Sequence, residues 1–467
     1  VLVDQSGVLA GKTVVSVSAG FRQCLALCSD GAVAAWGYTT GARPGLNPAT
    51  FGFSPVPVLV DTASGASALF GKSVVKVAAG LYHQLALCSD GTLVAWGFNG
   101  SRQLGDGTTT PTRLAPVKVY AAVPSALNGR TIIAIVAGDA HSLALFSDGV
   151  MAAWGDNRYG QLGINTTLGR VTEAVIPSLV GYAGDTFVGD TPTISIAAGQ
   201  EHSMALCSDG TVYAWGRNNE GQLGSGSVVS DYPFPYQVKT TNDSYGDSAL
   251  TGKTVVSISS GANHNIALCS DGSLAAWGHN YYGQLGDNTT TVRRAPAAVN
   301  VSSGVSALFD RAVIAIPASN PSAIHSVAIF SGVPEIEVEQ PAGFSLADGG
   351  SRDIGYSVVG SATAEFRFTI RNTGTAPLKG IAVAIDGADA AEFALVEIPT
   401  AELAAQGAEA VTVRFTPISG GSKTATLHIT SNDADESPFD IHLTAASGTE
   451  LTAAFTTESE VPLTTHG

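Results

Sequence analysis

Residues 80–97, GLYHQLALCSDGTLVAWG, bring together several side chains that could do chemistry. The stretch holds His83, Cys88, Asp90 and Trp96. Histidine, cysteine and aspartate are ligands that zinc accepts, and they are also the common groups of acid–base and nucleophilic catalysis. Taken alone, the stretch is therefore compatible with a metal site or with the edge of a catalytic pocket.

The stretch is one copy of an internal repeat, which changes how its histidine is interpreted. One histidine slot recurs along the chain: His83, His141, His202, His264 and His325. Zinc needs ligands that converge to about 2 Å from one ion, and equivalent positions on separate repeat units cannot meet there. We expect these histidines to be structural, lying between units with one ring nitrogen bonded to a neighbouring backbone carbonyl. No metal and no cofactor is predicted.

The cysteines and aspartates of the repeat also indicate structural roles. Cys28, Cys88, Cys207 and Cys269 share a slot that Phe146 and Phe330 fill in other copies, which is typical of packing. The aspartate of each Ser-Asp-Gly is expected to cap a turn. Two loops, GDGTTT (105–110) and GDNTTT (286–291), offer too few oxygen ligands for calcium. Without paired carboxylates, a nucleophile elbow or a phosphate loop, the chain is not expected to be an enzyme.

The elements that position these residues follow from the repeat period. Every tryptophan marks one unit of about sixty residues: Trp36, Trp96, Trp154, Trp215 and Trp277. Within one unit, four short apolar runs (73–80, 83–88, 92–97 and 116–119) are separated by turn residues. Four antiparallel strands per unit predict an all-β chain built from β-propeller blades, with the tryptophans as structural anchors.

The blade count predicted from the sequence is five full blades and a partial sixth. Residues 312–316 and 324–330 match only the first two strands of a unit. At the other end, VLVD (1–4) repeats VLVD (58–61), which is the fourth strand of a unit. Residues 1–4 could close the sixth unit, or the propeller could be truncated at its N-terminus. We expect truncation, because closure would still leave the sixth unit without its third strand.

The repeat resembles that of the regulator of chromosome condensation family over about residues 1–332. The pattern is complete in the fourth unit, with Gly199, His202, Leu206, Asp209-Gly210 and Trp215-Gly216, followed by Asn218 and Gly221-Gln222-Leu223-Gly224. The first unit departs from it, because Gln23 replaces the histidine and GARPG replaces Gly-Gln-Leu-Gly. The resemblance implies a β-propeller, of roughly seven blades in closed examples.

A second domain is predicted after the propeller repeats of residues 1–330. Residues 331–343 are expected to be a linker, residues 344–447 a β-sandwich, and residues 448–467 a tail or the start of a truncated further module. The runs FTIRNTGTAPL, VRFTPISGG and LHITSNDADESPFDIHLTA resemble the choice-of-anchor D domain, an immunoglobulin-like module. That family implies a large exported bacterial protein.

Charge and hydropathy exclude two classes of partner. The net charge is −16, of which residues 1–332 contribute −3 and residues 333–467 contribute −13. Nucleic-acid binding requires a basic surface, so it is not expected. No run of eighteen apolar residues occurs, so direct membrane insertion is not expected either.

The sequence therefore predicts a non-enzymatic protein-recognition or scaffold region, extracellular or on the cell surface. The partner is expected to be a protein that binds the variable propeller loops. Six loop residues of types common at interfaces are candidates for this contact: Tyr82, Arg158, Tyr159, Arg217, Tyr281 and Tyr282. Two alternatives remain, an enzyme inhibitor like the propellers that block β-lactamases and a regulator like a guanine-nucleotide exchange factor.

Overall fold

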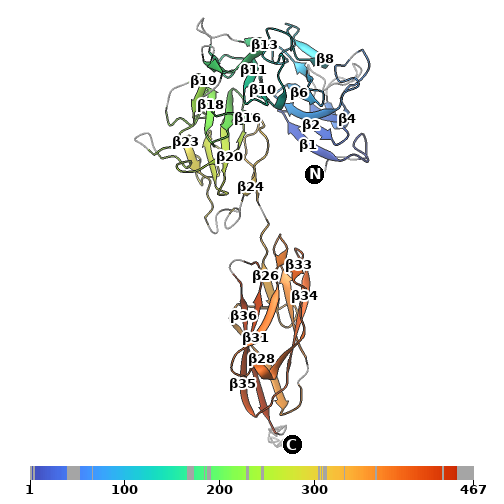
Figure 1. The fold of residues 1–467 in the computed structure, drawn as a ribbon, viewed down its shortest axis with the longest axis vertical. Helices are drawn as coiled ribbons and strands as arrows, with labels where there is room; N and C mark the ends of the chain where they lie inside the picture. The colour runs from blue at the N-terminus through green and yellow to red at the C-terminus, as the bar shows by residue number, and fades with distance from the viewer. Residues whose placement is uncertain are drawn as a thin grey trace, which may run out of the picture. The chain divides into compact units, whose positions relative to one another are not determined.

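The computed structural model divides into two compact units, Val1–Phe330 and Ser331–Gly467, which are described separately (Figure 1). The residues that the structure describes are 3, 6–38, 53–65, 67–165, 173–182, 185–186, 191–227, 231–242, 247–302, 306, 308, 313–330, 332–362, 365–433 and 436–449. The segments 1–2, 4–5 and 450–467 lie outside this set, so the predictions for VLVD (1–4) and for most of the C-terminal tail fall outside it too.

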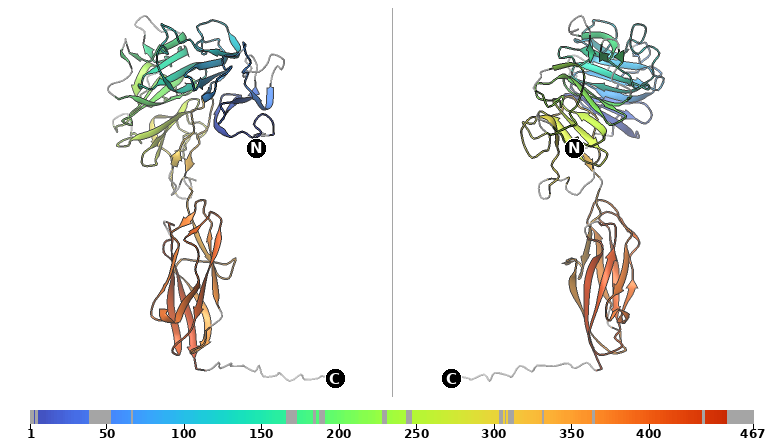
Figure 2. Two further views of the ribbon diagram at one scale, coloured as in Figure 1. Left: turned by 45° about the vertical axis from the view of Figure 1, so that its right-hand side comes forward. Right: turned by 60° about the vertical axis from the view of Figure 1, so that its left-hand side comes forward.

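The described part of the first unit contains five four-stranded antiparallel sheets arranged as propeller blades (Figure 2). Blade 1 is β1 (Val14–Ala19), β2 (Gln23–Cys28), β3 (Val33–Tyr38) and β4 (Phe53–Leu59). Blade 2 is β5 (Val74–Ala79), β6 (His83–Cys88), β7 (Leu93–Phe98) and β8 (Thr112–Lys118). Blade 3 is β9 (Ile132–Ala137), β10 (His141–Phe146), β11 (Met151–Asp156) and β13 (Glu173–Leu179). Blade 4 is β16 (Thr193–Ala198), β17 (His202–Cys207), β18 (Val212–Arg217) and β19 (Asp231–Gln237). Blade 5 is β20 (Val255–Ser260), β21 (His264–Cys269), β22 (Leu274–Gly278) and β23 (Arg293–Ala298).

The prediction of five four-stranded blades and a partial sixth is confirmed. The sixth sheet has two short strands, β24 (Val313–Ala315) and β25 (Ile329–Phe330). Residues 324–328, predicted to belong to its second strand, have no strand geometry. A small sheet of β12 (Ile164–Asn165), β14 (Gly181–Tyr182) and β15 (Asp185–Thr186) was not predicted.

The Ser-Asp-Gly turns have the structure that their residue types predict. In blade 2, the backbone N–H of Thr92 donates to Oδ1 of Asp90 at 3.0 Å, and Gly91 has a φ of 81°. Lys72 forms an ion pair with Asp90 and holds the pKa of its carboxyl below the usual value. The aspartate therefore caps a tight hairpin, as expected.

A hydrogen-bonded junction, which we call the clasp, joins blade 2 to blade 3, blade 3 to blade 4 and blade 4 to blade 5. In the loop of blade 2, the carbonyl oxygen of Gln103 accepts from Trp154 Nε1 at 2.9 Å and from Ser142 Oγ at 2.9 Å, and both donors belong to blade 3. Gln161 accepts from Trp215 and Ser203 at 2.9 and 2.8 Å. Gln222 accepts from Trp277 and Asn265 at 3.1 and 2.6 Å.

The repeated histidines extend the clasp, and their partner differs from the one predicted. Nε2 of His83 lies 2.9 Å from Ser142 Oγ, and Nε2 of His141 lies 3.0 Å from Ser203 Oγ. Each serine donates its own proton to a glutamine carbonyl, so the histidine Nε2 must carry the proton and donate it. The partner is thus a side chain of the next blade, because serine and tryptophan already reach the backbone carbonyl.

His202 and His264 are bonded in the same way, whereas His325 is not. Nε2 of His202 lies 2.8 Å from Asn265 Oδ1, and Nε2 of His264 lies 3.0 Å from Ser326 Oγ. His325 is exposed to solvent, because its sheet has only two strands among the described residues and no further blade follows it there. The prediction of an inter-blade position is wrong for this histidine.

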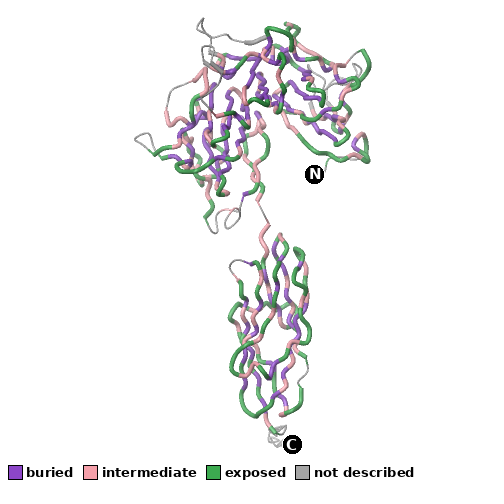
Figure 3. The backbone as a smooth tube through the Cα atoms, viewed as in Figure 1, coloured by how far each residue is buried: buried purple, intermediate pink, exposed green. Residues whose placement is uncertain are grey.

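Blade 1 is the least buried of the full blades (Figure 3). On its inner strand, Val14 is 38% and Val17 65% exposed, whereas the equivalent Val255 and Ile258 of blade 5 are buried. In the other full blades, this face of the inner strand packs on the preceding blade. Among the described residues, blade 1 has no such neighbour.

The second unit is a β-sandwich, as predicted. One sheet has the order β27-β26-β29-β34-β32 and the other β28-β36-β35-β31, with a small pair β30-β33. The strands are β26 (Ile336–Glu339), β27 (Ser345–Leu346), β28 (Gly350–Val358), β29 (Phe366–Asn372), β30 (Leu378–Lys379), β31 (Ala382–Asp386), β32 (Phe393–Glu397), β33 (Glu402–Leu403), β34 (Ala408–Phe415), β35 (Gly421–Thr430) and β36 (Phe439–Gly448). Strand β26 lies within residues 331–343, so part of the predicted linker belongs to the sandwich, where Val338 is fully buried.

Replacing a clasp serine tests the junction between blades 3 and 4. Ser203→Ala removes the acceptor of His141 and one donor to Gln161, so we expect the free energy of unfolding to fall by about 1–3 kcal/mol. Ser203→Asn should restore most of it, because Asn265 fills the equivalent position in blade 5. Urea unfolding followed by tryptophan fluorescence measures both variants. Equal losses for alanine and asparagine would contradict the role of the clasp.

The buried histidines predict that acid destabilises the propeller. Burial lowers the pKa of His83 and His141 to about 3 and that of His202 and His264 to about 4. The unfolded chain, with histidine pKa values near 6.5, therefore binds more protons, and stability falls as the pH drops below about 6.5. At pH 5 the loss is about 2 kcal/mol for each histidine.

The free energy of unfolding, determined at pH 7.5 and at pH 5, measures this loss. Tryptophan fluorescence reports on the propeller alone, because all five tryptophans lie in it. His141→Asn should reduce the difference in unfolding free energy between the two pH values by about 2 kcal/mol. An unchanged difference in this variant would show that other groups cause the acid sensitivity.

Candidate functional site

The loops that vary between repeats lie on one face of the propeller. In blade 4, His202 at the start of β17 pairs with Gly216 near the end of β18. The connection from first to second strand and the connection from third to fourth strand therefore leave the blade at the same end. We call this side of the propeller, which carries the same two loops in every full blade, the loop face.

Blades 3 and 4 place a charged and aromatic cluster on the loop face. Arg217 forms an ion pair with Glu201, and its guanidinium carbon lies 4.9 Å from the centre of the Tyr159 ring. Arg158 is exposed and pairs with Asp156, with Nη2 2.9 Å from Oδ2. The structure thus brings two predicted candidates, Tyr159 and Arg217, into contact across two blades.

Asp139 lies in the same region, in the loop between β9 and β10. Its backbone N–H donates to the carbonyl of Gln200 at 3.1 Å, whereas its buried Oδ1 has no hydrogen-bond partner among the described residues. Burial, together with repulsion from Glu201, raises the pKa of Asp139 to about 7. This carboxyl group is therefore partly protonated near neutral pH.

Blade 5 presents an exposed aromatic pair. Tyr281 is 62% and Tyr282 75% exposed. His279 packs against both rings, with centroid distances of 4.6 and 5.9 Å, and its Nδ1 accepts a hydrogen bond from Gln284 Nε2 at 2.6 Å. The remaining candidate, Tyr82, packs edge-on against Phe21 of blade 1 at 6.3 Å. The six candidates thus form three separate groups and do not form one pocket.

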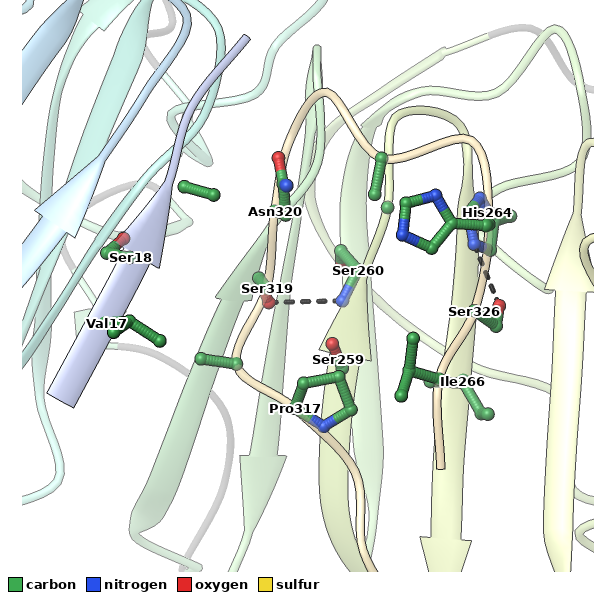
Figure 4. A pocket seen from close by; sticks show the side chains of 16 residues that line it. Val17, Ser18, Ser259, Ser260, His264, Ile266, Pro317, Ser319, Asn320 and Ser326 are labelled. Carbon is green, nitrogen blue, oxygen red and sulfur yellow. Dashed lines mark hydrogen bonds between the residues drawn. The ribbon is translucent and has the colours of Figure 1, made fainter. Parts of the chain in front are cut away.

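A cavity of about 420 Å³ lies between β1 and the end of the repeat array (Figure 4). Ser18, Ser260 and Asn320 contribute polar groups to its wall, and Val17 and Ile266 contribute apolar ones. Ser260 N–H donates to Ser319 Oγ at 3.1 Å, and His264 bonds Ser326. The lining contains no carboxylate or thiol among the described residues. Ser326 donates its proton to the carbonyl of Gln284, so the His264–Ser326 contact is not the pairing in which histidine accepts the proton of a nucleophile.

Metal chemistry has little support in the described part of the chain. Those residues contain no group of three histidine, cysteine or acidic side chains placed to hold an ion. In the GDGTTT loop, Asp106 accepts from Thr108 N–H at 3.0 Å and from Arg113 Nε at 2.7 Å, so its charge is already paired. Desolvation raises the pKa of Cys88 to about 11, which leaves its thiol protonated and unreactive.

Three residues of the loop face were not among the six predicted candidates. Phe21 and His279 support the exposed tyrosines, and Asp139 has a titrating carboxyl. Asp139 lies two residues before the repeated His141, but sequence spacing contains no information on its burial. No helix in the described segments combines the length and apolarity that crossing a bilayer requires.

Comparison with curated proteins identifies relatives of the propeller. The ultraviolet-B receptor UVR8 of Arabidopsis thaliana is 31% identical over 296 residues, which cover 63% of this chain and 60% of UVR8. The mouse E3 ubiquitin-protein ligase HERC2 is 33% identical over 292 residues, covering 62% of this chain and 5% of HERC2. The chain therefore matches less than two thirds of the length of either relative.

Solved structures share the fold at lower identity. Human WBSCR16 matches with a TM-score of 0.54 and 22% identity, over 68% of this chain and 72% of that one. Prp20p of Saccharomyces cerevisiae matches with a TM-score of 0.53 and 22% identity, over 67% of each chain. The family described as RCC1-like domain matches residues 2–325, which is more than half of the chain. Together with the repeated clasp and blades, this match shows that the chain belongs to the family of RCC1-like domain proteins, whose propeller is a protein-interaction scaffold.

Proposed function

We propose that this chain is a non-enzymatic protein-recognition region of a large exported or cell-surface bacterial protein, with the loop face as its binding surface. The observation that carries the proposal is the set of exposed aromatic and charged side chains on the loop face. The blades that carry these loops are held together by the hydrogen bonds of the clasp. Tyrosine and arginine dominate the energetics of protein interfaces, and both occur here in exposed positions.

The architecture of the loop face supports recognition of a protein partner. Arg217 N–H donates to the carbonyl of Glu201 at 2.9 Å, and His279 N–H donates to that of Asn263 at 2.8 Å. These bonds hold the backbone of each loop without using its side chains. A rigid main chain with variable side chains loses little entropy on binding, which favours affinity.

Relatives support the same kind of partner. Yeast Prp20p binds Gsp1p and histones, and a second structure holds the same protein together with Kap60. Those proteins are partners of Prp20p. For this chain they support a protein as the partner class, while its own net charge of −16 gives no attraction for nucleic acid.

The second unit supports the proposed location. It is a β-sandwich, and its sequence resembles the choice-of-anchor D domain of exported bacterial proteins. In this proposal the sandwich is a spacer between the propeller and the rest of the protein.

Antibodies against the propeller should label intact producing cells as strongly as permeabilised ones. Labelling only after permeabilisation would contradict a surface location.

Substitution of the blade 5 tyrosines tests the binding surface. Partners are captured from an extract of the producing cells on the immobilised chain, identified, and their affinities measured by calorimetry. Tyr281→Ala combined with Tyr282→Ala should weaken binding at least tenfold, because exposed interface tyrosines contribute about 2 kcal/mol or more. Phe70→Ala is the control, since Phe70 is also an exposed aromatic residue and precedes β5, at the end of the blade opposite to the loop face. Full affinity in the tyrosine variant would exclude this part of the loop face.

A further inference from the structure

The outer face of one sandwich sheet carries a histidine between two carboxylates. In the sheet β28-β36-β35-β31, the side chains of β35 alternate, so Leu427 and Ile429 are buried in the core while His428 lies on the outer face. His428 is paired in register with Asp440 of β36, and Asp386 belongs to β31, on the other side of β35. One imidazole ring therefore lies between side chains of the two strands that flank its own.

Both ring nitrogens of His428 face a carboxylate. Nδ1 lies 2.7 Å from Oδ1 of Asp440, and Nε2 lies 2.9 Å from Oδ1 of Asp386. An ionised carboxylate only accepts hydrogen bonds, and a neutral imidazole has a single N–H. A neutral ring would therefore place one unprotonated nitrogen against a negative oxygen, whereas an imidazolium has a proton for each carboxylate. The geometry favours the charged ring.

The neighbouring titratable groups strengthen this preference. Asp348, in the turn before β28, accepts the backbone N–H of Asp440 at 2.7 Å and adds a further carboxylate beside the pair. His442 of β36 shares the outer face, where its Nδ1 lies 3.3 Å from Oγ1 of Thr426. The contacts with Asp386 and with Asp440 raise the pKa of His428 above its ordinary value of 6.5.

The strand that Asp386 belongs to is the one most in need of such a tie. Strand β31 is the last in its sheet and has five residues, and among the described residues it pairs only with β35. Its inward side chains, Val383 and Ile385, are only partly buried. Short edge strands with few buried contacts open at a lower free energy than central strands do. The contact of Asp386 with His428 adds an ionic attraction across the pairing of β31 with β35.

We propose that Asp386, His428 and Asp440 form a proton-dependent lock, in which the charged ring holds the edge strand β31 in its sheet and loss of the proton lets that strand open. The sign of the pH dependence follows from the raised pKa. The stabilisation is complete below 6.5, the value in the unfolded chain, and is lost as the pH rises through the higher value of the folded chain. The buried propeller histidines respond in the opposite sense. The lock lies in the second unit and does not depend on the function proposed for the loop face.

Hydrogen exchange of the full chain, read by mass spectrometry, measures the opening of β31. The protection factors of the amides of residues 382–386, which are corrected for the intrinsic pH dependence of exchange, should fall about threefold or more between pH 6 and pH 8. His428→Gln should abolish this difference. His442→Gln is the matched control, because His442 is a histidine of the same face bonded to Thr426, and it should leave the difference unchanged. Constant protection in the unmodified chain, or equal behaviour of the two variants, would overturn the lock.

A milder variant keeps the test valid if His428→Gln does not fold. The side chain of Asp386 is 72% exposed, so Asp386→Asn should not prevent folding. Titration of the histidine ring signals by nuclear magnetic resonance should give His428 a midpoint above pH 6.5 in the unmodified chain and a lower midpoint in Asp386→Asn. A midpoint at or below 6.5 in the unmodified chain, or one that Asp386→Asn does not move, would contradict the proposal.

Discussion

The interaction on which the propeller depends is a backbone carbonyl that accepts two hydrogen bonds from the next blade. Gln103, Gln161 and Gln222 each supply this oxygen to a tryptophan and to a serine or asparagine. The glycine two residues later has to lack a side chain, because the same indole fills its space. A single acceptor therefore fixes the tryptophan, the Gly-Gln-Leu-Gly loop and the residue after the repeated histidine together.

This constraint explains why the loop face can vary. The clasp and the histidines stabilise the junctions from within, and the loop backbones are held by main-chain bonds such as those of Arg217 to Glu201 and His279 to Asn263. The side chain before the histidine slot is not part of the clasp, and in the five full blades the chain places arginine, tyrosine, alanine, glutamate or asparagine there, with Gln23 filling the slot in the first. Recognition and stability use different atoms of the same loop, so one can change without loss of the other.

The sequence predicts the parts of this fold that rest on local pattern. Tryptophan spacing predicts the blades, and Ser-Asp-Gly predicts the hairpins with their aspartate caps. The partners of the histidines were not predicted, because they lie about sixty residues away and the shared acceptor is a main-chain oxygen, which no residue type reveals. The same limit applies to Asp139, whose raised pKa depends on burial and on Glu201 of another blade. His325 matches the repeat in sequence but lacks, in the described part of the chain, the neighbouring strands that bury its counterparts.

The first blade differs from the later blades in how well its repeat residues are covered. Trp36 is only partly buried and Val17 is exposed, whereas the corresponding Trp277 and Ile258 of blade 5 are buried. The difference follows from the order of packing, because the inner strand of each later full blade lies against the blade before it. Burial in this fold is therefore a property of neighbouring blades: equivalent repeat residues are buried where the described chain supplies the preceding blade.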